Sequence, residues 1–292
     1  MCLIRRIIVP KHFDIVHSKI NNLIRFYGKL LRVHHSQVLL DFSSVEYVSD
    51  DALVVLKAQI EKANQTKRHK TIYIINGPKN KRILYTIKKQ FGYSSNNNEK
   101  EIHIDKYIKD IKKDTTINTE IIDKTVRELK TININEYFEP FYDFLVELIG
   151  NATEHGIKDK HISWWLIHDK DTTHRQCMRY FFVDMGCGIA ASHRRAKLPF
   201  KYLFRRDSKI VKDSMDGVLK SSTGQPNRGR GLPFIKNVVE KGYISNFFLV
   251  TNRTSVKFDN GRLIYSHNKN FIGTYFTWTI NKDNLLAWKN LK

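Results

Sequence analysis

The chain has 292 residues, of which 41% are hydrophobic and 12% aromatic, so a packed core is expected and wholesale disorder is not. No apolar run approaches the ~18–20 residues of a membrane span, and no signal peptide is recognised. Three scattered cysteines predict neither a disulfide framework nor a zinc site. These features favour a cytoplasmic protein without membrane contact. Fifty basic against twenty-nine acidic residues give a net charge of +21, which either favours anionic partners, among them nucleic acid, or reflects a composition rich in Lys and Asn.

Residues 1–95 alternate between segments of helical and of strand character, which predicts a small α/β domain. Apolar residues recur every three or four positions in the first helix, whereas the strands are short apolar runs of the kind that is covered on both faces. The expected elements, in chain order, are a helix over 13–31, a strand over 36–42, a helix over 50–65, a strand over 71–77 and a helix over 80–93.

The stretch VLLDFSSVEYVSDDALVVL places a strand that ends in Asp41 before a turn and a helix start. It resembles the STAS domain of anti-sigma factor antagonists, in which a serine in a DSSG turn accepts a phosphate. The segment from Ser49 to Ala52 occupies that turn here, and Asp51 stands where the resemblance places the phosphorylated serine. A fixed carboxylate at this helix start either mimics a permanently phosphorylated state or is an ordinary N-cap.

A polar, helix-poor stretch, YSSNNNEKE, indicates a linker over 96–114, and the pattern changes after it. Residues 115–292 predict helices combined with a mostly antiparallel sheet, an α+β sandwich. The expected elements are helices over 118–130 and 138–155, a hairpin of strands over 162–169 and 178–185, a long basic segment over 190–228, a helix over 231–242 and four short strands over 246–252, 254–259, 262–267 and 273–280.

The helix over 138–155 carries a polar stripe beside its apolar face. Its members follow one another at steps of four, so their side chains lie one above the other. They are Asp143, Glu147, Asn151 and His155. Such a stripe is either a solvated surface or part of a site, and the helix alone does not distinguish the two.

Three motifs that contain glycine follow along the chain. In VDMGCGI, Asp184 ends a strand and offers a carboxylate to an amine, while Gly186 and Gly188 let the backbone approach a flat ligand. In NRGRGLPFI, glycines directly precede a helix, whose free N–H groups suit phosphate oxygens. In GTYFTW, Gly273 and Thr274 begin a strand.

Taken in order, ELIGNATEHG, DMGCGI, GRGL and GTYFTW resemble the motifs of the GHKL (histidine-kinase-like) ATPases, and of the serine-kinase anti-sigma factors in particular, over about residues 135–281. The resemblance implies a Bergerat-type ATP-binding fold with ATP and Mg²⁺ as cofactors. It implies that Asn151 binds Mg²⁺ through its amide oxygen and that Glu147, one turn earlier, is the general base. His155 either orients the phosphates or caps the helix.

The same resemblance implies an adenine pocket and a cradle for the phosphates. Asp184 would accept a hydrogen bond from the adenine amino group, with Gly186 and Gly188 beside the base and Thr274 behind it. The phosphates would lie on the second glycine motif. The residues expected to contact them are Arg228, Gly229, Arg230 and Gly231.

Residues 194–212 depart from the family pattern in length and charge, because eight basic residues face Asp207 alone. The resemblance makes this stretch the ATP lid. It is either a solvated loop or a nucleotide-sensitive surface that binds an acidic partner or a nucleic-acid backbone.

Three functions fit these motifs. The first is an ATP-binding regulatory switch, a Mg-dependent ATPase or serine/threonine kinase that controls a protein partner. The second is an ATPase whose nucleotide-driven closure as a homodimer acts on nucleic acid. The third is a non-catalytic interaction module that retains ATP for structure, which the presence of Glu147 disfavours. A histidine kinase is disfavoured because no dimerisation hairpin with a phospho-acceptor histidine precedes the domain.

Overall fold

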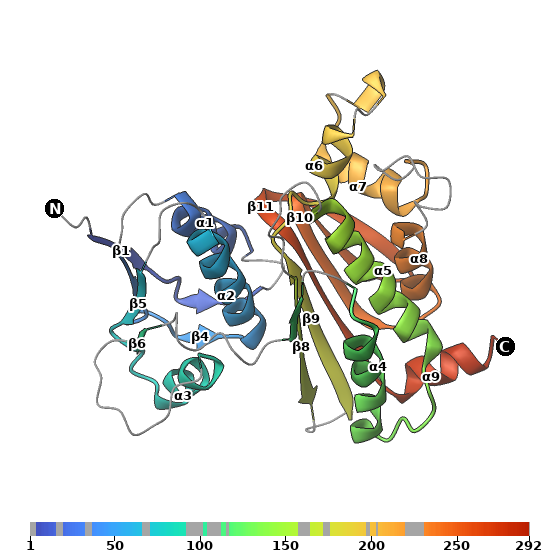
Figure 1. Cartoon of the computed structure of the whole chain (residues 1–292), viewed down its shortest axis with the longest axis horizontal. Coiled ribbons are helices and arrows are strands. Elements are labelled where there is room, and N and C mark those ends of the chain that lie inside the picture. The colour runs from blue at the N-terminus through green and yellow to red at the C-terminus, as the bar shows by residue number, and fades with distance from the viewer. Residues whose placement is uncertain are drawn as a thin grey trace. The chain divides into compact units, whose positions relative to one another are not determined.

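The computed structural model of the chain is shown in Figure 1. It describes residues 4–15, 20–32, 37–65, 71–91, 102–103, 112–114, 117–156, 164–171, 176–196, 199–202, 204–219 and 231–291. Backbone contacts divide the chain into two compact units, Met1–Ile111 and Lys112–Lys292. None of the helices in the described ranges has the length and apolar character that a bilayer span requires.

The N-terminal unit combines a mixed sheet with helices. Its described elements are β1 (Ile4–Ile8), β2 (His12–Phe13), α1 (Ile20–Arg32), β3 (Gln37–Asp41), β4 (Tyr47–Val48), α2 (Asp50–Gln65), β5 (Thr71–Ile75), α3 (Lys81–Gln90) and β6 (Ile102–His103). Strands β1, β3 and β5 are parallel neighbours, β6 is antiparallel to β5, and β2 and β4 form a separate parallel pair. The alternation of strands and helices confirms the predicted α/β class.

Phe13 lies at the centre of this unit's core. Its ring is fully buried and meets the rings of Phe26, Tyr27 and Phe42 edge-on, at centroid distances of 5.4, 6.1 and 6.0 Å. The helix predicted over 13–31 therefore began too early, because Phe13 belongs to β2 and α1 begins after it. Strand β2 exists through its pairing with β4, a non-local contact that periodicity cannot reveal.

The predicted linker over 96–114 contains two short strands, β6 and β7 (Lys112–Asp114). Strand β6 pairs with β5 of the N-terminal unit, and β7 pairs with β8 (Trp164–Asp171) of the C-terminal unit. Each is only two or three residues long, so its extended shape comes from the neighbouring strand rather than from its own propensity.

The C-terminal unit is an antiparallel sheet combined with helices. Its described elements, with η for a 3₁₀ helix, are β7 (Lys112–Asp114), α4 (Thr119–Arg127), η3 (Glu128–Ile132), α5 (Glu139–Gly156), β8 (Trp164–Asp171), β9 (Cys177–Asp184), α6 (Ile189–Arg195), η4 (Phe200–Tyr202), α7 (Asp207–Met215), α8 (Gly231–Glu240), β10 (Ser245–Asp259), β11 (Arg262–Ile280) and α9 (Lys282–Lys289). The strand order is β10-β11-β9-β8-β7, and each neighbouring pair is antiparallel. The predicted hairpin of β8 and β9 is confirmed.

One apolar cluster joins α4, α5, α8 and α9 to this sheet, so these helices form a layer over it (Figure 1). Helix α5 supplies the centre of the contact. Phe144 meets the indole of Trp278 at 4.9 Å, and Phe141 meets Tyr180 at 4.8 Å. Burial of each such side chain contributes about 1.5–3 kcal/mol. Pro140 falls in the first turn of α5, where its missing N–H is tolerated.

The four short strands predicted over 246–280 are two long strands, β10 and β11. Asn260 and Gly261 connect them with φ of 50° and 74°, the positive values that a tight two-residue turn requires. Around Asn252 the register shifts while the strand continues. The polar residues at that bulge give the sequence the appearance of a strand end.

A basic segment was predicted over 190–228, and the name is kept here for its described part, residues 189–196, 199–202 and 204–219. Most of these residues are helical rather than the solvated loop that one interpretation of the sequence predicted. It contains α6, η4 and α7. Ion pairs at helical spacing support α7, with Lys209 Nζ 2.8 Å from Asp213 and Lys212 Nζ 2.6 Å from Asp216. The apolar residues of α7, which join the core of the unit, are Ile210, Val211 and Met215.

Candidate functional site

Helices α5 and α8 meet at Gly231, beside two polar side chains of the α5 stripe. A Cβ atom added to Gly231 would lie 2.7 Å from Oε2 of Glu147 and 2.8 Å from Nδ2 of Asn151. Both polar groups therefore lie against the first turn of α8, at a distance that only glycine allows. The helix stripe and the second glycine motif therefore lie side by side at these three residues.

Asn151 carries an unsatisfied hydrogen-bond donor. Its Nδ2 atom is buried and has no hydrogen-bond partner among the described residues. A buried amide left in this state costs about 1–3 kcal/mol, so folded proteins usually satisfy it with protein, water or a ligand. The side chain thus has the character of a binding group.

Asp184 ends β9 directly opposite Thr274 of β11. Its carboxylate accepts a hydrogen bond from Gly186 N–H at 2.8 Å, and the nearby hydroxyl and backbone N–H of Thr274, both donor groups, also favour its charged form. Burial is the largest influence and raises the pKa of Asp184 to about 6 in spite of these donors. A buried carboxylate without a cationic partner of its own is costly to keep, which is typical of a functional group.

Gly273 makes this arrangement possible. It has a φ of 96°, and a Cβ atom there would lie 2.1 Å from the carbonyl oxygen of Asp184. We expect Gly273→Ala to lower the free energy of unfolding by about 3–5 kcal/mol, because a strained backbone and a clash with backbone atoms add together. Urea denaturation of both proteins measures the difference.

Gly261→Ala is the matched control for that substitution. Gly261 also has a positive φ, of 74°, but a Cβ atom there meets nothing within 4 Å. Only the left-handed strain of about 1–2 kcal/mol should remain. Equal losses in the two variants would show that the approach of Gly273 to Asp184 does not matter.

Thr251 and Asn252 hold the first glycine motif in place, and the sequence analysis missed both. The N–H of Ile189 donates to Thr251 Oγ1 at 2.9 Å, and Asn252 Nδ2 donates to the carbonyl oxygen of Cys187 at 2.8 Å. Gly188, with φ of 82°, lies so close to the Asn252 amide that a Cβ atom would be 2.7 Å from it. An asparagine within a strand rich in apolar and β-branched residues was the available signal, since it tolerates the left-handed conformation of a bulge.

The predicted site residues Asn151, Asp184, Gly186, Gly188 and Thr274 line one cleft between α5, the end of β9, α6 and β11. The cleft has a volume of about 40 Å³, which is room for about one water molecule. Cys187 and His193 also line it, and apolar residues complete its walls. These are Leu148, Ala152, Ile189, Leu232 and Phe276.

Glu147 and Gly231 lie beside Asn151 rather than in the wall of this cleft. His155 belongs to α5, but its side chain lies outside the described residues, as do Arg228, Gly229 and Arg230. The described part of the chain contains no group of three His, Cys, Asp or Glu side chains that could hold a metal ion. A metal at Asn151 would therefore need most of its oxygen ligands from water or a bound anion.

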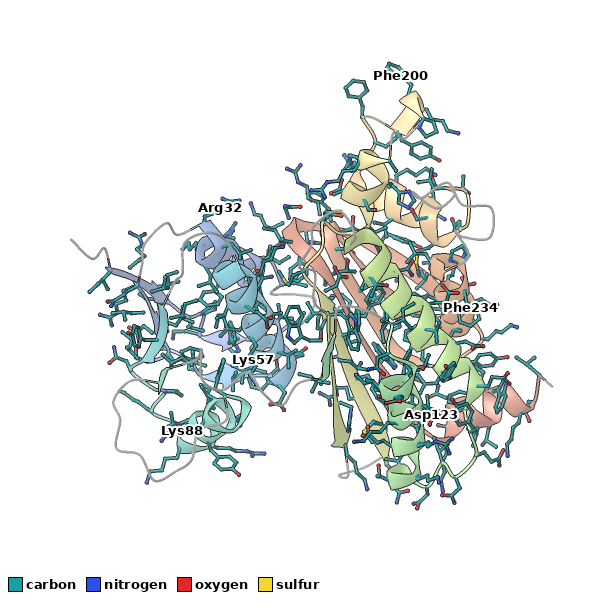
Figure 2. The ribbon with its side chains drawn as sticks, in the orientation of Figure 1. Arg32, Lys57, Lys88, Asp123, Phe200 and Phe234 are labelled. Atoms are coloured by element: carbon teal, nitrogen blue, oxygen red, sulfur yellow. The ribbon has the colours of Figure 1, made fainter. Side chains whose placement is uncertain are left out.

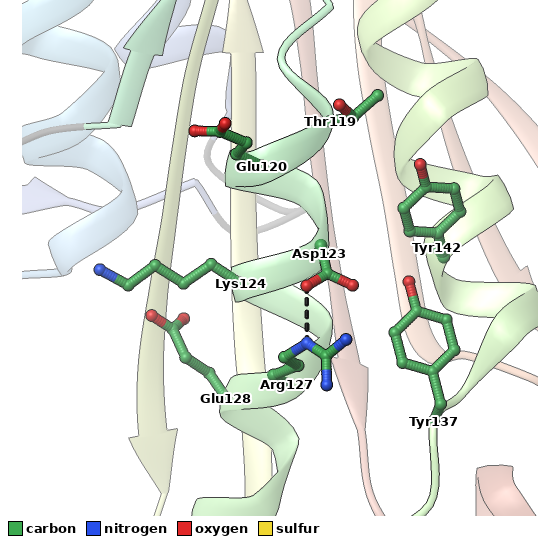
Figure 3. A pocket seen from close by; sticks show the side chains of 8 residues that line it. All are labelled: Thr119, Glu120, Asp123, Lys124, Arg127, Glu128, Tyr137 and Tyr142. Carbon is green, nitrogen blue, oxygen red and sulfur yellow. Dashed lines mark hydrogen bonds and ion pairs between the residues drawn. The ribbon is translucent and has the colours of Figure 1, made fainter.

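A second, larger groove of about 650 Å³ lies along α4 and the start of α5 (Figure 3). Two of its charged groups, Asp123 and Arg127, are paired with each other. Arg127 Nε donates to Asp123 at 2.6 Å, and its guanidinium lies 5.7 Å from the ring centre of Tyr137. Partial burial, with Asp123 beside it, raises the pKa of Tyr137 to about 12. The smaller cleft differs from this groove in that one of its lining residues, Asn151, carries a buried donor without a hydrogen-bond partner among the described residues.

No protein-family model matches the chain, and a search of curated proteins finds no significant match.

Proposed function

We propose that the chain is an ATP-binding regulatory protein of the GHKL class, whose C-terminal unit has a Bergerat-type fold and binds ATP with Mg²⁺. The proposed activity is that of a Mg-dependent ATPase or a serine/threonine kinase that acts as a switch on a protein partner. The observation that carries the proposal is the meeting of Asn151, Asp184 and Thr274 in one cleft, with Glu147 and Gly231 beside it. These residues are up to 127 positions apart in the sequence.

The chemistry of the residues fits the two ends of a nucleotide. At one end, the buried carboxylate of Asp184 can accept from the adenine amino group, while Gly186 and Gly188 expose backbone beside the base. At the other end, the Asn151 amide can offer its oxygen to Mg²⁺ and its unsatisfied Nδ2 to a phosphate oxygen. When bound, Mg²⁺ would neutralise charge on the phosphates.

Glu147 fits the role of general base. It lies one helical turn before Asn151 and against Gly231 at the start of α8. Its carboxylate would take the proton of an attacking water, which makes an ATPase, or of a partner's hydroxyl, which makes a kinase. The geometry of this chain favours neither acceptor.

A volume of 40 Å³ does not accommodate a purine ring, so binding requires the walls of the cleft to separate. The start of α6 is held by hydrogen bonds to Thr251 and Asn252, so the contact of α5 with α8 at Gly231 is the place where the walls can separate with the smaller loss of hydrogen bonds. Nucleotide binding in this proposal is therefore coupled to movement of α8, which is what a switch needs.

For the N-terminal unit we propose a STAS-like role in regulating the ATP-binding unit. Strand β3 ends at Asp41 and α2 begins at Asp50, as the resemblance predicts. Asp51 Oδ1 accepts a hydrogen bond from Ala52 N–H at 2.8 Å in the first turn of α2. This contact favours a capping role for Asp51, and such a carboxylate adds about 0.3–1 kcal/mol at a helix N-terminus.

Asn151→Ala tests the proposal, because a structural and a binding role predict opposite effects on stability. Since Nδ2 has no partner, the variant should unfold at the same or a slightly higher urea concentration than the wild type. Its affinity for Mg·ATP should fall at least about tenfold, for the loss of one charge-assisted contact. Isothermal titration calorimetry with Mg·ATP measures the affinity.

Asn284→Ala is the control, because Asn284 has the same amide side chain, is more deeply buried than Asn151, and has hydrogen-bond partners for its Nδ2 atom. Its Nδ2 donates to the carbonyl oxygen of Gly242 at 2.7 Å and to Ser245 Oγ at 2.8 Å. This variant should lose about 2 kcal/mol of stability and keep its affinity. Absence of binding heat in the wild type, or an Asn151→Ala variant that resembles Asn284→Ala in both measurements, would refute the proposed site.

A further inference from the structure

The basic segment carries, in the middle of its sequence, two aromatic rings that the fold does not bury. Phe200 is 78% exposed and Phe204 is 89% exposed, more than any other large hydrophobic side chain in the described residues. The ring centres are 6.4 Å apart and the ring planes are nearly perpendicular, at 84°. Figure 2 places Phe200 at the end of this segment that lies farthest from the five-stranded sheet. Solvent exposure of two such rings marks an interaction surface.

The acidic residues of the basic segment are neutralised within it. Asp207 pairs with Arg194 at 2.6 Å, and the two acids at the end of α7 pair with lysines one turn earlier. Four exposed cations of the basic segment, three of them within two residues of one of the rings in the sequence, form no ion pair with any residue that the structure describes. They are Arg195, Lys201, Arg205 and Arg206. The surface offered to a partner is therefore positively charged as well as aromatic.

We propose that this tip, the rings of Phe200 and Phe204 with the four unpaired cations, binds single-stranded nucleic acid. Each nucleotide presents a flat base and a phosphate, and proteins bind such strands by stacking bases on aromatic rings while cations follow the backbone. The two perpendicular rings cannot lie on the face of one base, so they would contact successive bases. A duplex buries its base faces, which makes it the poorer ligand for rings of this kind.

Other polyanionic surfaces fit the tip less well. Helices that bind in a membrane interface present a continuous apolar face, and their affinity grows with the apolar area they bury. Here the apolar residues of α7 lie in the protein core, which leaves two rings for a bilayer. A protein partner would have to supply a packed pocket for each ring and an acidic side chain for each cation, whereas every nucleotide brings both a flat base and a phosphate. The proposal does not rest on the ATP site and is tested without nucleotide.

The experiment is fluorescence anisotropy with labelled single strands of about 20 nucleotides, as DNA and as RNA, and with the matched duplex. We expect the wild type to bind single strands more tightly than duplex. The double variant Phe200→Ala/Phe204→Ala should weaken single-strand binding about 10–100-fold and leave duplex binding within about twofold, because only the stacking contacts are lost. Both side chains are exposed, so the circular dichroism spectrum should not change.

Two further variants separate stacking from charge. Arg205→Ala/Arg206→Ala should weaken binding to single strands and duplex alike, and should reduce the slope of log affinity against log salt by about two. Tyr85→Ala, which removes a 67% exposed aromatic ring on α3, should change neither affinity. Equal affinity of the wild type for single strand and duplex, or no effect of the double Phe variant, would overturn the proposal.

Binding of the tip to a membrane instead of nucleic acid would give a different result in a vesicle flotation assay. If the wild type floats with vesicles of phosphatidylserine and phosphatidylcholine, the double Phe variant does not, and neither binds single strands at low salt, the tip is a membrane contact and the proposal is wrong.

Discussion

Glu147→Gln is expected to reduce the rate of ATP turnover at least about 100-fold while the affinity for Mg·ATP stays within about threefold. Glutamine keeps the shape and one acceptor oxygen of the side chain, but it cannot take a proton at neutral pH. Since Glu147 lies against Gly231 and next to Asn151, its removal as a base should not disturb the contacts proposed for the phosphates. Phosphate release and transfer of the γ-phosphate to the protein partner report on turnover.

Asp143→Asn is the matched control, because it makes the same chemical change one turn earlier on the same stripe of α5. Asp143 is exposed and does not line the cleft. Turnover by this variant should equal that of the wild type. If Glu147→Gln turns over ATP at the normal rate, Glu147 is not the base; if both variants lose turnover equally, the stripe acts through the general charge of the helix.

Local sequence patterns correctly predicted the elements in which the spacing of apolar residues agrees with the pattern of buried residues. The 16-residue helix α2 and the strands β3 and β5 were located from apolar spacing alone, and the structure has them where they were expected. Helix α5 was recognised in the same way, with Pro140 in its first turn. In each case the sequence within one element is sufficient to determine its type.

Non-local pairing accounts for the elements that were missed or misplaced. Strand β2, with Phe13, exists through its pairing with β4, and the short strands β6 and β7 exist through their pairing with β5 and β8. The division of β10 at Asn252 was wrong because a bulge and a strand end have the same composition. These features depend on contacts that one-dimensional spacing does not contain.

The residues of the candidate site also fall into two groups, those that local spacing predicts and those that only non-local contacts reveal. Glu147 and Asn151 were accessible from helical spacing, and Asp184 from its position after a strand. The pairing of Asp184 with Thr274 needed the register of β9 and β11. Thr251, which anchors the start of α6, could not be recognised at all, because a threonine in a strand is ordinary until its partner is known.

Asp184→Asn is expected to raise the free energy of unfolding at neutral pH by up to about 3 kcal/mol. Burial raises the pKa of Asp184 to about 6, against an ordinary value of 3.8 that applies to the unfolded chain. Above about pH 6 the folded protein must hold a buried negative charge. Asparagine removes the free-energy cost of burying that charge, while its Oδ1 still accepts a hydrogen bond from Gly186 N–H. Urea unfolding at about pH 7.5 measures the gain.

The sign of the pH dependence follows from the same values. Between about pH 4 and pH 6 the folded state binds a proton at Asp184 that the unfolded state has released, so this group favours folding as the pH falls through that window. The stability advantage of Asp184→Asn should therefore shrink from about pH 6 downward and vanish near pH 4, where the wild-type carboxyl is neutral in both states. A difference that stays constant over this range would mean that the pKa of Asp184 is not raised.

The same substitution should weaken Mg·ATP binding about 10–100-fold at neutral pH, because the carboxylate proposed to accept from the adenine amino group is replaced by a neutral amide. A functional site predicts a residue that destabilises the fold and strengthens ligand binding, whereas substitution of a purely structural residue would not lower the affinity for Mg·ATP.

Asp216→Asn is the control, because it makes the same chemical change at a carboxylate outside the cleft. Burial opposes the charge of Asp216 as well, but Lys212 and Lys236, at 2.6 and 2.7 Å, outweigh it and lower its pKa. The substitution there should destabilise the protein at neutral pH, with no change in affinity, so that the same chemical change gives stability differences of opposite sign at the two positions.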